Sequence, residues 1–524
     1  MLARKHLHAS LSRPRSLRAL CRLDDTRPLG HHGVHTAPGS AVRPYSELPG
    51  NWKNNWFNLY QYWKDDGIHN IHNIMLSNFQ KYGPIYREKI GTYENINIID
   101  PTDSATLFKA EGLYPERFLV PAWSAYRDFR NKPYGVLLKS GESWRHDRLI
   151  LNKEAMALEL MESFVPLLNE VGQDFIKRVQ AKIQNSGQGL PNKCVLDLSQ
   201  QVLTRPLRLL VSAAVCHVLY GTRLGLLQDF VDPESQRFID AVTVMFETTP
   251  LMLYIPPSFL RRINAKVWQN HVRAWDFIFQ HADKCIQNFY RDMRLNQKTG
   301  PERDYRSILS NILLKNKMPI EDVKASITEM MAGGVDTTSI TLQWAMYELA
   351  RAPGLQDQLR SEILTAKAAS QGDILKTLKT VPLLKATVKE TLRLHPVAVT
   401  VQRYPAEDII LQNYFIPAKT LVQVGIYAMG RDPRYFHKPE QFNPQRWLNQ
   451  EAKYFRLLGF GFGPRQCLGR RIAELEMYLF LINMLENFKI ESKRGAEVGT
   501  TFNLILLPDK PIYFTLRPIS APNP

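Results

Sequence analysis

The chain has 524 residues, of which 44% are hydrophobic and 22% are charged, and its formal net charge is +17. These are ordinary values for a globular protein, and the chain is long enough to bury a large core and a cavity. The basic residues are spread out without a helix-turn-helix, zinc-finger or aromatic RNA-binding pattern, so we expect an acidic protein or an anionic membrane surface as partner, and no nucleic acid. No apolar run reaches the length of about 18 residues that a membrane-spanning helix requires.

The N-terminal segment differs from the rest of the chain. Up to Leu23 it carries arginines, a lysine, serines and leucines but no acidic residue, which is typical of a mitochondrial presequence. A disordered basic tail is the alternative interpretation. We therefore predict a presequence and flexible N-terminus at residues 1–44 and a single large domain at 45–524. The histidines of HHGVH (31–35) look like metal ligands, but they fall in the segment that we expect to be removed.

Helical patterns dominate the remainder. Residues 83–100 alternate as a β-hairpin does, residues from about 150 to 400 follow a helical period, and short strand patterns return at 407–429 and near the C-terminus. The sequence therefore predicts a mainly α-helical domain with small peripheral β-sheets.

The apolar stretch TTPLMLYIPPSFL (248–260) lies between two helical segments and is followed by Arg261 and Arg262. Prolines bracket it, which suits a buried connection. An apolar tip with adjacent arginines also suits contact with a membrane face. The sequence leaves these two interpretations open.

A long helical pattern at 321–351 contains Gly333-Gly334, followed by Asp336, Thr337 and Thr338. Two glycines cost a helix on the order of 2 kcal/mol relative to alanines, and threonine hydroxyls can bond the backbone and bend or open the helix. We interpret this as a place where a ligand approaches the backbone, or where an acid and an alcohol face a cavity. Close packing of another helix over the glycines is the alternative.

The next helix, at 385–396, is ended by Pro396 and carries Glu390 and Arg393, which are neighbours on one helix face. Such a pair is usually a solvated surface pair. If it is buried it needs further partners, and Arg446 is a candidate.

The loop FGFGPRQCLG (460–469) contains Cys467, one of five cysteines that form no CxxC pair. Their odd number and wide spacing argue against a disulfide framework and against a structural zinc site. A thiolate is a soft metal ligand, its pKa falls beside a cation, and glycines allow the backbone to curl around the sulfur. A buried structural cysteine is the commoner fate of a free thiol, but the pattern F-x-x-G-x-R-x-C-x-G has too many fixed positions to be accidental.

These motifs, in this order, resemble those of the cytochrome P450 haem-thiolate monooxygenases, over nearly all of residues 45–518. The resemblance implies haem b with Cys467 as the axial iron ligand, and Asp336 and Thr337 as the acid–alcohol pair of the oxygen-activating helix. It implies Glu390, Arg393 and Arg446 as a structural triad. For the haem propionates it implies Trp144 and Arg148 of WRHDR, with Arg403 and Arg465 as further candidates.

Longer stretches, such as TEMMAGGVDTTSITLQW and CLGRRIAELEM, are similar to the mitochondrial class of this family. That resemblance implies cholesterol and molecular oxygen as substrates, pregnenolone as product and a small [2Fe-2S] ferredoxin, itself reduced by an NADPH-dependent reductase, as electron donor. It implies peripheral attachment to the matrix side of the inner membrane. Lys385 and Lys389 correspond to lysines that face the ferredoxin, and Arg470 and Arg471 can extend that patch.

Two alternatives and one departure accompany this resemblance. The alternatives are a related mitochondrial hydroxylase acting on another steroid, sterol or vitamin D, and a haem-binding sensor or carrier without oxygenase turnover. The departure lies at 200–221, where this family has a smooth apolar helix but this chain has Pro206 and extra arginines. Because proline inside a helix costs about 3 kcal/mol, we interpret the stretch either as a real kink or as an error in the gene model.

Overall fold

The computed structural model describes residues 41–186, 196–197, 204–221, 233–296, 307–448, 455–492 and 497–519. Backbone contacts divide the chain into residues 1–42 and 43–524, and the second unit is the one described below. Most of the predicted presequence, the histidines at 31–35, Cys21 and Cys194 lie outside the described residues.

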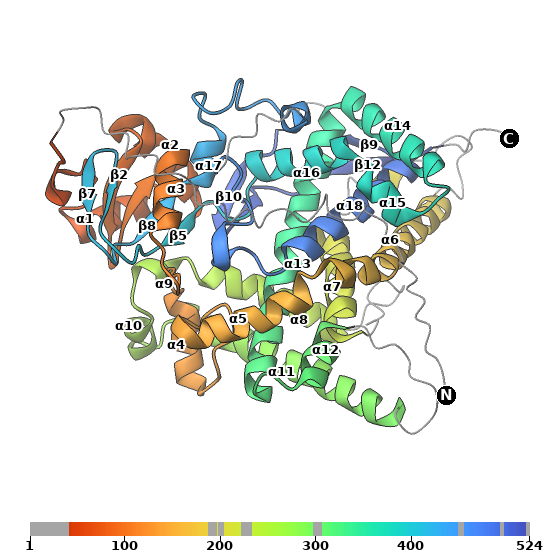
Figure 1. The fold of residues 1–524 in the computed structure, drawn as a ribbon, viewed down its shortest axis with the longest axis horizontal. Coiled ribbons are helices and arrows are strands. Elements are labelled where there is room, and N and C mark those ends of the chain that lie inside the picture. Colours follow the sequence, from red (N-terminus) through yellow and green to blue (C-terminus); the bar gives the residue numbers. More distant parts are fainter. Residues whose placement is uncertain are drawn as a thin grey trace, which may run out of the picture. The chain divides into compact units, whose positions relative to one another are not determined.

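Helices make up most of the second unit (Figure 1), so the predicted fold class is confirmed. In the N-terminal half they are α1 Asn55–Lys64, α2 Gly67–Tyr82, α3 Pro101–Lys109, α4 Pro121–Arg130, α5 Gly141–Ala155, α6 Leu158–Ser186, α7 Thr204–Tyr220, α8 Pro233–Thr248, α9 Leu251–Tyr254 and α10 Pro257–Arg262. The later helices are α11 Lys266–Asn296, α12 Ile308–Lys315, α13 Ile320–Arg351, α14 Pro353–Ala369, α15 Ile374–Lys379, α16 Pro382–Leu394, α17 Ile426–Gly430 and α18 Arg470–Asn487. Short 3-10 turns are η1 Tyr45–Glu47, η3 Pro444–Trp447 and η4 Gly463–Arg465.

The strands form small separate sheets. One sheet has the order β1-β2-β3-β8-β5 and is built from Gly50–Asn51, Ile85–Ile90, Tyr93–Ile98, Val422–Val424 and Val401–Arg403. The others are β6 Ile409–Leu411 with β7 Tyr414–Ile416, β10 Thr500–Asn503 with β11 Ile505–Pro508, and β12 Phe514–Pro518 between β4 Leu196–Asp197 and β9 Phe488–Ser492. The predicted hairpin at 83–100 is confirmed, because β2 pairs antiparallel with β3 and Ile85 lies opposite Ile98.

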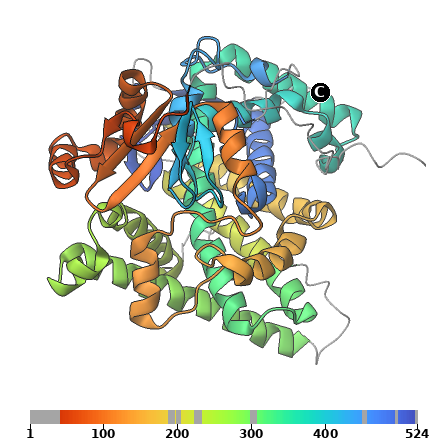
Figure 2. The same ribbon diagram turned by 60° about the vertical axis from the view of Figure 1, so that its left-hand side comes forward.

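Helix α13 runs through the middle of this unit in both ribbon views (Figures 1 and 2). It contacts α7, α11, α16 and α18, and most of its residues from Val323 to Ala350 belong to the buried core. The backbone stays helical through Gly333 and Gly334, so the expected opening of the helix is absent. Gly333 and Gly334 have a low helix propensity, but the helices packed around α13 stabilise it as a helix there.

Helix α7 corrects the expected kink over residues 204–221, whereas residues 200–203 lie outside the described residues. It begins at Thr204, so Pro206 lies in the first turn, and the helix continues unbroken to Tyr220. Amide groups of the first turn have no acceptor within the helix, so a proline there removes no hydrogen bond. The cost of an interior proline therefore does not apply.

The stretch 248–260 combines the two interpretations that the sequence left open. Thr249, Met252 and Tyr254 are buried, which is the behaviour of a buried connection. On α10, by contrast, Phe259 is 54% exposed and Arg261 is also exposed. No helix among the described residues has both the length and the apolar character needed to cross a membrane.

Candidate functional site

The cysteine loop folds back on itself before α18. Gly461 and Gly463 have φ values of +71° and +70°, a left-handed conformation that favours glycine. A Cβ on Gly463 would lie 2.5 Å from a carboxylate oxygen of Glu111. The Cys467 N–H donates to the Phe460 carbonyl at 2.8 Å, so the loop presents the cysteine just ahead of the first turn of α18.

Cys467 is both accessible and desolvated. Its side chain is exposed to a solvent-sized probe, yet burial raises the pKa of its thiol, while the Gly469 N–H and the Arg148 guanidinium act in the opposite direction. A residue that is both desolvated and accessible lies on the wall of an enclosed space. The groups that lower the pKa, which also include Arg470, do not overcome burial, so a stable thiolate at this point calls for a bound metal ion.

The open face of α13 provides a second wall. Between Val323 and Ala350 the residues that are not buried are Lys324 near the start and then Met330, Gly333, Gly334 and Thr337. Met330, Gly333 and Thr337 are spaced so that they share one helix face, and Gly334 lies at the edge of that face, towards α7. Since neighbouring helices cover the rest of α13, this face opens into the interior of the protein.

The two glycines have different roles. A Cβ on Gly333 would meet nothing within 4 Å, whereas a Cβ on Gly334 would lie 3.2 Å from a methyl group of Val215 on α7. Gly333 therefore leaves space for a ligand, and Gly334 allows close helix packing. The packing interpretation is therefore confirmed for Gly334, whereas the approach of a ligand at Gly333 stays a prediction.

Asp336 and Thr337 do not face the cavity together. The Thr337 hydroxyl lies on the open face and donates to the Gly333 carbonyl at 2.8 Å. Asp336 is 1% exposed and lies against α7, where its Oδ1 is 2.8 Å from Nε of Arg208. Consecutive residues on a helix point about 100° apart, so an acid and an alcohol at these two positions cannot share a face.

Four arginines gather around the cysteine loop. Arg148 donates to the Gln466 carbonyl at 2.6 Å. Arg465 donates to the carbonyl of Pro115 at 2.9 Å and its guanidinium lies 3.8 Å from the centre of the Trp144 ring. Arg403 donates to the Phe462 carbonyl at 2.9 Å, and Arg117 completes the group.

This arginine cluster, Arg117, Arg148, Arg403 and Arg465, is short of negative charge. Burial lowers the pKa of Arg117 and of Arg148 to about 10 and that of Arg465 to about 9, and repulsion from Arg403 contributes for Arg117 and Arg465. The carboxylate that pairs with the cluster is Glu111, 2.6 Å from Nε of Arg403.

Nitrogens of the cluster also lack partners, since Nε of Arg148 and Nη1 of Arg465 are buried without a hydrogen bond. Buried charged donors of this kind normally have an anionic acceptor. The residues therefore fit a bound group that carries carboxylates and places a metal at Cys467, which is the combination that haem supplies.

Behind the loop, Glu390 is fully paired. Its carboxylate accepts from Arg393 at 2.8 and 2.9 Å, from Nε of Arg446 at 2.9 Å, from the Trp447 indole at 2.8 Å and from the Asn443 N–H at 2.8 Å. Glu390 and Arg393 have no exposed side-chain surface. Because each charge is compensated and hydrogen-bonded, this buried group joins α16 to the segment around η3 instead of destabilising it.

The lysines of α16 lie on its outer face. From Leu383 to Leu394, Lys385 and Lys389 are the residues that are not buried. Burial and the charge of Lys389 lower the pKa of Lys385, and the charge of Glu474 on α18 opposes that shift. Glu474 also accepts from Arg470 at 3.2 Å, so the lysines and the start of α18 form one basic surface.

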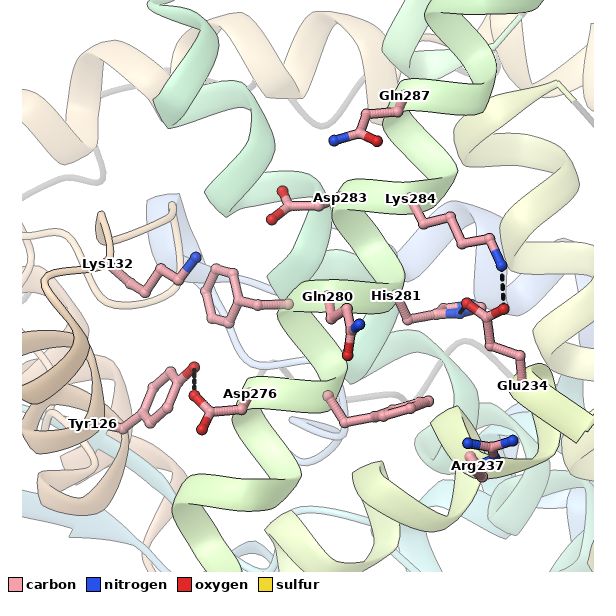
Figure 3. A pocket seen from close by; sticks show the side chains of 12 residues that line it. Tyr126, Lys132, Glu234, Arg237, Asp276, Gln280, His281, Asp283, Lys284 and Gln287 are labelled. Carbon is pink, nitrogen blue, oxygen red and sulfur yellow. Dashed lines mark hydrogen bonds and ion pairs between the residues drawn. The ribbon is translucent and has the colours of Figure 1, made fainter.

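A separate hollow of about 710 Å³ runs along α11 (Figure 3). Figure 3 shows charged side chains around it, and several pair with one another: Lys284 with Glu234, and the Tyr126 hydroxyl with Asp276 at 3.0 Å. Apolar ligands need mostly apolar walls. The polar lining therefore does not suit a sterol.

Comparison with known proteins agrees with this geometry. Residues 49–516 match the model of the family described as Cytochrome P450. The chain therefore belongs to the cytochrome P450 family, and it is a monooxygenase of the class that holds haem iron on a cysteine thiolate.

The most similar relatives carry one name. The "Cholesterol side-chain cleavage enzyme, mitochondrial" of Oncorhynchus mykiss is 55% identical over 513 residues, 98% of each chain. Proteins of the same name from Bos taurus and Homo sapiens are 51% and 50% identical over 94% of each chain.

Some residues of the site were not found from the sequence. Arg117 of the arginine cluster and Glu111, which pairs with Arg403, match no motif. Arg208 lies in the segment that departs from the family pattern. A signal for Arg208 existed, since an arginine in an apolar helix must find an acid or solvent, but its partner could not be named without the fold.

The two glycines of α13 generate a matched test. Gly333→Ala should raise the free energy of unfolding by about 1 kcal/mol, because alanine is the better helix former and its methyl group meets no atom. Gly334→Leu should lower it by about 1–3 kcal/mol through collision with Val215. Urea unfolding followed by circular dichroism measures the free energy of unfolding of both variants. Changes of equal size and the same sign would contradict the different roles of Gly333 and Gly334.

Proposed function

We propose that this protein cleaves the side chain of cholesterol by successive oxygenations to give pregnenolone, the first step of steroid hormone synthesis. The observation that carries the proposal is the identity of 50–55% over 94–98% of the chain to enzymes with that name. The uncovered face of α13 at Gly333 and Thr337 supports it, because a sterol needs space in the interior of the protein.

In this proposal Cys467 holds the haem iron, and Trp144, Arg148, Arg403 and Arg465 hold the propionates, with Arg117 as an addition. When bound, haem supplies the activation of oxygen. Each oxygenation also consumes protons, and the hydroxyl of Thr337 is placed to donate one at the open face of α13, from its hydrogen bond with the Gly333 carbonyl. Asp336 is the acid that supplies the path, and Glu390, Arg393 and Arg446 keep the loop in place.

The direct test is reconstitution of the holoprotein with cholesterol, a mitochondrial ferredoxin and its reductase. Pregnenolone should form, and Cys467→His should abolish both the product and the red-shifted absorption band of the reduced carbon monoxide complex. Products hydroxylated on the steroid nucleus, or turnover of vitamin D with no pregnenolone, would identify the protein as a related hydroxylase. Retention of the shifted band in Cys467→His would place the iron ligand elsewhere.

We further propose that the ferredoxin docks on the basic surface made by Lys385, Lys389, Arg470 and Arg471. Among the described residues neither lysine has an ion pair, so both charges are available to an acidic partner. Attraction between opposite charges raises the association rate and orients the partner before contact.

Lys389→Glu should weaken ferredoxin binding by on the order of tenfold at low ionic strength and flatten its salt dependence. The absorption spectrum and sterol binding should not change. Lys64→Glu is the control, because it makes the same charge change on α1, which neither ribbon view places beside α16 (Figures 1 and 2). Equal loss in both variants would mean that only the net charge matters, and wild-type affinity in Lys389→Glu would exclude this surface.

Residues 1–44 are proposed to direct the protein to mitochondria, where it binds the matrix side of the inner membrane peripherally. Four aromatic side chains of α1, Trp56, Phe57, Tyr60 and Trp63, are 55–65% exposed. Tyr62 of the same helix packs on Tyr254 of α9 with ring centres 5.3 Å apart, and both views place α1 at the same end as α10 with its exposed Phe259 (Figures 1 and 2). Aromatic residues beside basic ones are typical of an interfacial membrane contact.

The double variant Trp56→Ser/Trp63→Ser should sediment less with vesicles that contain anionic phospholipid, because it loses the largest interfacial side chains. Tyr513→Ser, which removes another exposed aromatic residue, should bind as the wild type does. Unchanged binding of the double variant would show that α1 does not touch the membrane.

A further inference from the structure

A short segment, residues 135–139, lies between α13 and the arginine cluster and is termed the strap. On the side of α13 it is held by Glu329, whose side chain is buried. Oε1 of Glu329 accepts the Gly135 N–H at 3.0 Å, and Oε2 accepts the Leu137 N–H at 2.7 Å. Each oxygen serves one backbone donor, so the ionised carboxylate suits this place, whereas an amide offers a single acceptor oxygen.

The strap lies unusually close to α13. Between the two bonds to Glu329, the Ser326 hydroxyl accepts the Val136 N–H at 3.1 Å. A Cβ on Gly135 would lie 2.4 Å from Oε2 of Glu329 and 2.8 Å from the backbone of α13. Glycine at this position therefore allows a close approach that any side chain would prevent.

The other side of the strap meets the arginine cluster. The Leu137 carbonyl accepts from Nη2 of Arg117, and the Lys139 carbonyl accepts from Nη2 of Arg465 at 3.0 Å. A guanidinium is planar and rigid, so a hydrogen bond at one nitrogen fixes the direction of the others. One of these others is Nη1 of Arg465, which is buried and makes no hydrogen bond among the described residues.

Leu137 joins the two sides of the strap directly. Its N–H donates to Glu329, and its carbonyl accepts from Arg117. The two peptide units are planar and share one Cα atom. A shift of the N–H away from Glu329 therefore also moves the carbonyl that holds Arg117.

Arg127 of α4 supplies a counter-charge for Glu329. Its Nη2 lies 3.8 Å from Oε1 of Glu329, and its guanidinium lies 4.1 and 4.5 Å from the ring centres of Trp275 and Phe279. Among the described residues its three guanidinium nitrogens make no hydrogen bond. Burial raises the pKa of Glu329 and the charge of Arg127 opposes that shift. Arg127 thus favours the ionised carboxylate while both oxygens stay bonded to the strap.

We propose that Glu329 is a positioning residue for the haem site: through the strap it orients Arg117 and Arg465 towards the haem carboxylates, and it thereby sets haem retention and the midpoint potential of the iron. The role of the arginines rests on the proposed function, whereas the hydrogen bonds of the strap do not. Nearby positive charge favours reduced iron, which carries one positive charge less. Displacement of the two guanidiniums should therefore lower the potential.

Spectroelectrochemical titration of the sterol-free holoprotein tests the proposal. In Glu329→Gln the potential should fall, and transfer of haem to excess apomyoglobin should accelerate by on the order of tenfold, because one acceptor oxygen remains for two N–H groups. A purely electrostatic effect of Glu329 has the opposite sign, since loss of a negative charge raises the potential. An increase in the potential of Glu329→Gln would therefore overturn the proposal.

Gly135→Ala tests the strap without any change of charge. Its methyl group collides with Glu329, so the potential should fall and haem transfer should accelerate as in Glu329→Gln. Ser326→Ala guards against failure of these two variants to fold, because it removes one neutral acceptor only. It should lower the potential by a smaller amount, and a wild-type potential in both Ser326→Ala and Gly135→Ala would exclude the strap as a positioning element.

Glu362→Gln is the matched control. Glu362 of α14 also accepts two backbone N–H groups, from Leu383 at 3.0 Å and from Leu384 at 3.2 Å, but its partners belong to α16 and not to the strap. The potential and the rate of haem transfer should keep their wild-type values. If Glu362→Gln and Glu329→Gln shift both quantities equally, the effect is a general loosening of the protein and the proposal is wrong.

Arg465→Gln separates failure of the strap from failure of the arginine assignment. It removes one cation of the cluster and should lower the potential directly. If it does so while Glu329→Gln and Gly135→Ala have no effect, the cluster holds the haem but the strap does not position it. If Arg465→Gln has no effect, Arg465 does not bind the haem carboxylates and the proposal falls with that assignment. Neither measurement uses a sterol, so both outcomes are independent of which substrate the protein oxidises.

Discussion

The arrangement of this protein depends on the balance of charge around Cys467. The buried thiol of Cys467 has a raised pKa, and near it Arg117, Arg148 and Arg465 have lowered pKa values. Each group alone is costly to bury, because a charge in a low-dielectric interior needs a partner. A group that carries a metal and two carboxylates satisfies both needs, so haem binding and the stability of this region are linked.

The buried charges of Glu390, Arg393 and Arg446 behind the loop find their partners within the protein. Glu390 is as deeply buried as any group in the arginine cluster, but five hydrogen bonds from the protein satisfy it. Such a group needs no ligand. The difference explains why one set of charges is a binding site and the other is a fixed support that positions the segment leading to the cysteine loop.

The faces of helix α13 have different surroundings. One face is open at Gly333 and Thr337, while another packs so closely on α7 that Gly334 can have no side chain without contact to Val215. Asp336 falls on the packed side. The geometry of the helix therefore separates the acid from the alcohol, and Asp336 pairs with Arg208 of α7.

The sequence by itself determined what is local to one segment: the helical period of α13 and α16, the hairpin of β2 and β3, and the glycine loop that presents Cys467. In each case the spacing of residues along a single element sets the local geometry, so the sequence alone was sufficient to predict it. The sequence also indicated that Glu390 and Arg393 share a helix face, and that Pro206 occurs in a helical segment.

Tertiary structure decided the rest, because it depends on which distant segments meet. Pro206 does not interrupt the helix, because α7 begins at Thr204 and the proline lies in its first turn. The pairing of Glu111 with Arg403 and of Arg208 with Asp336 joins residues that are far apart in the chain, and no local pattern encodes such a contact. The roles of the two glycines were likewise inseparable in the sequence, since only the packing of α7 over one side of α13 gives one of them a neighbour and leaves the other facing open space.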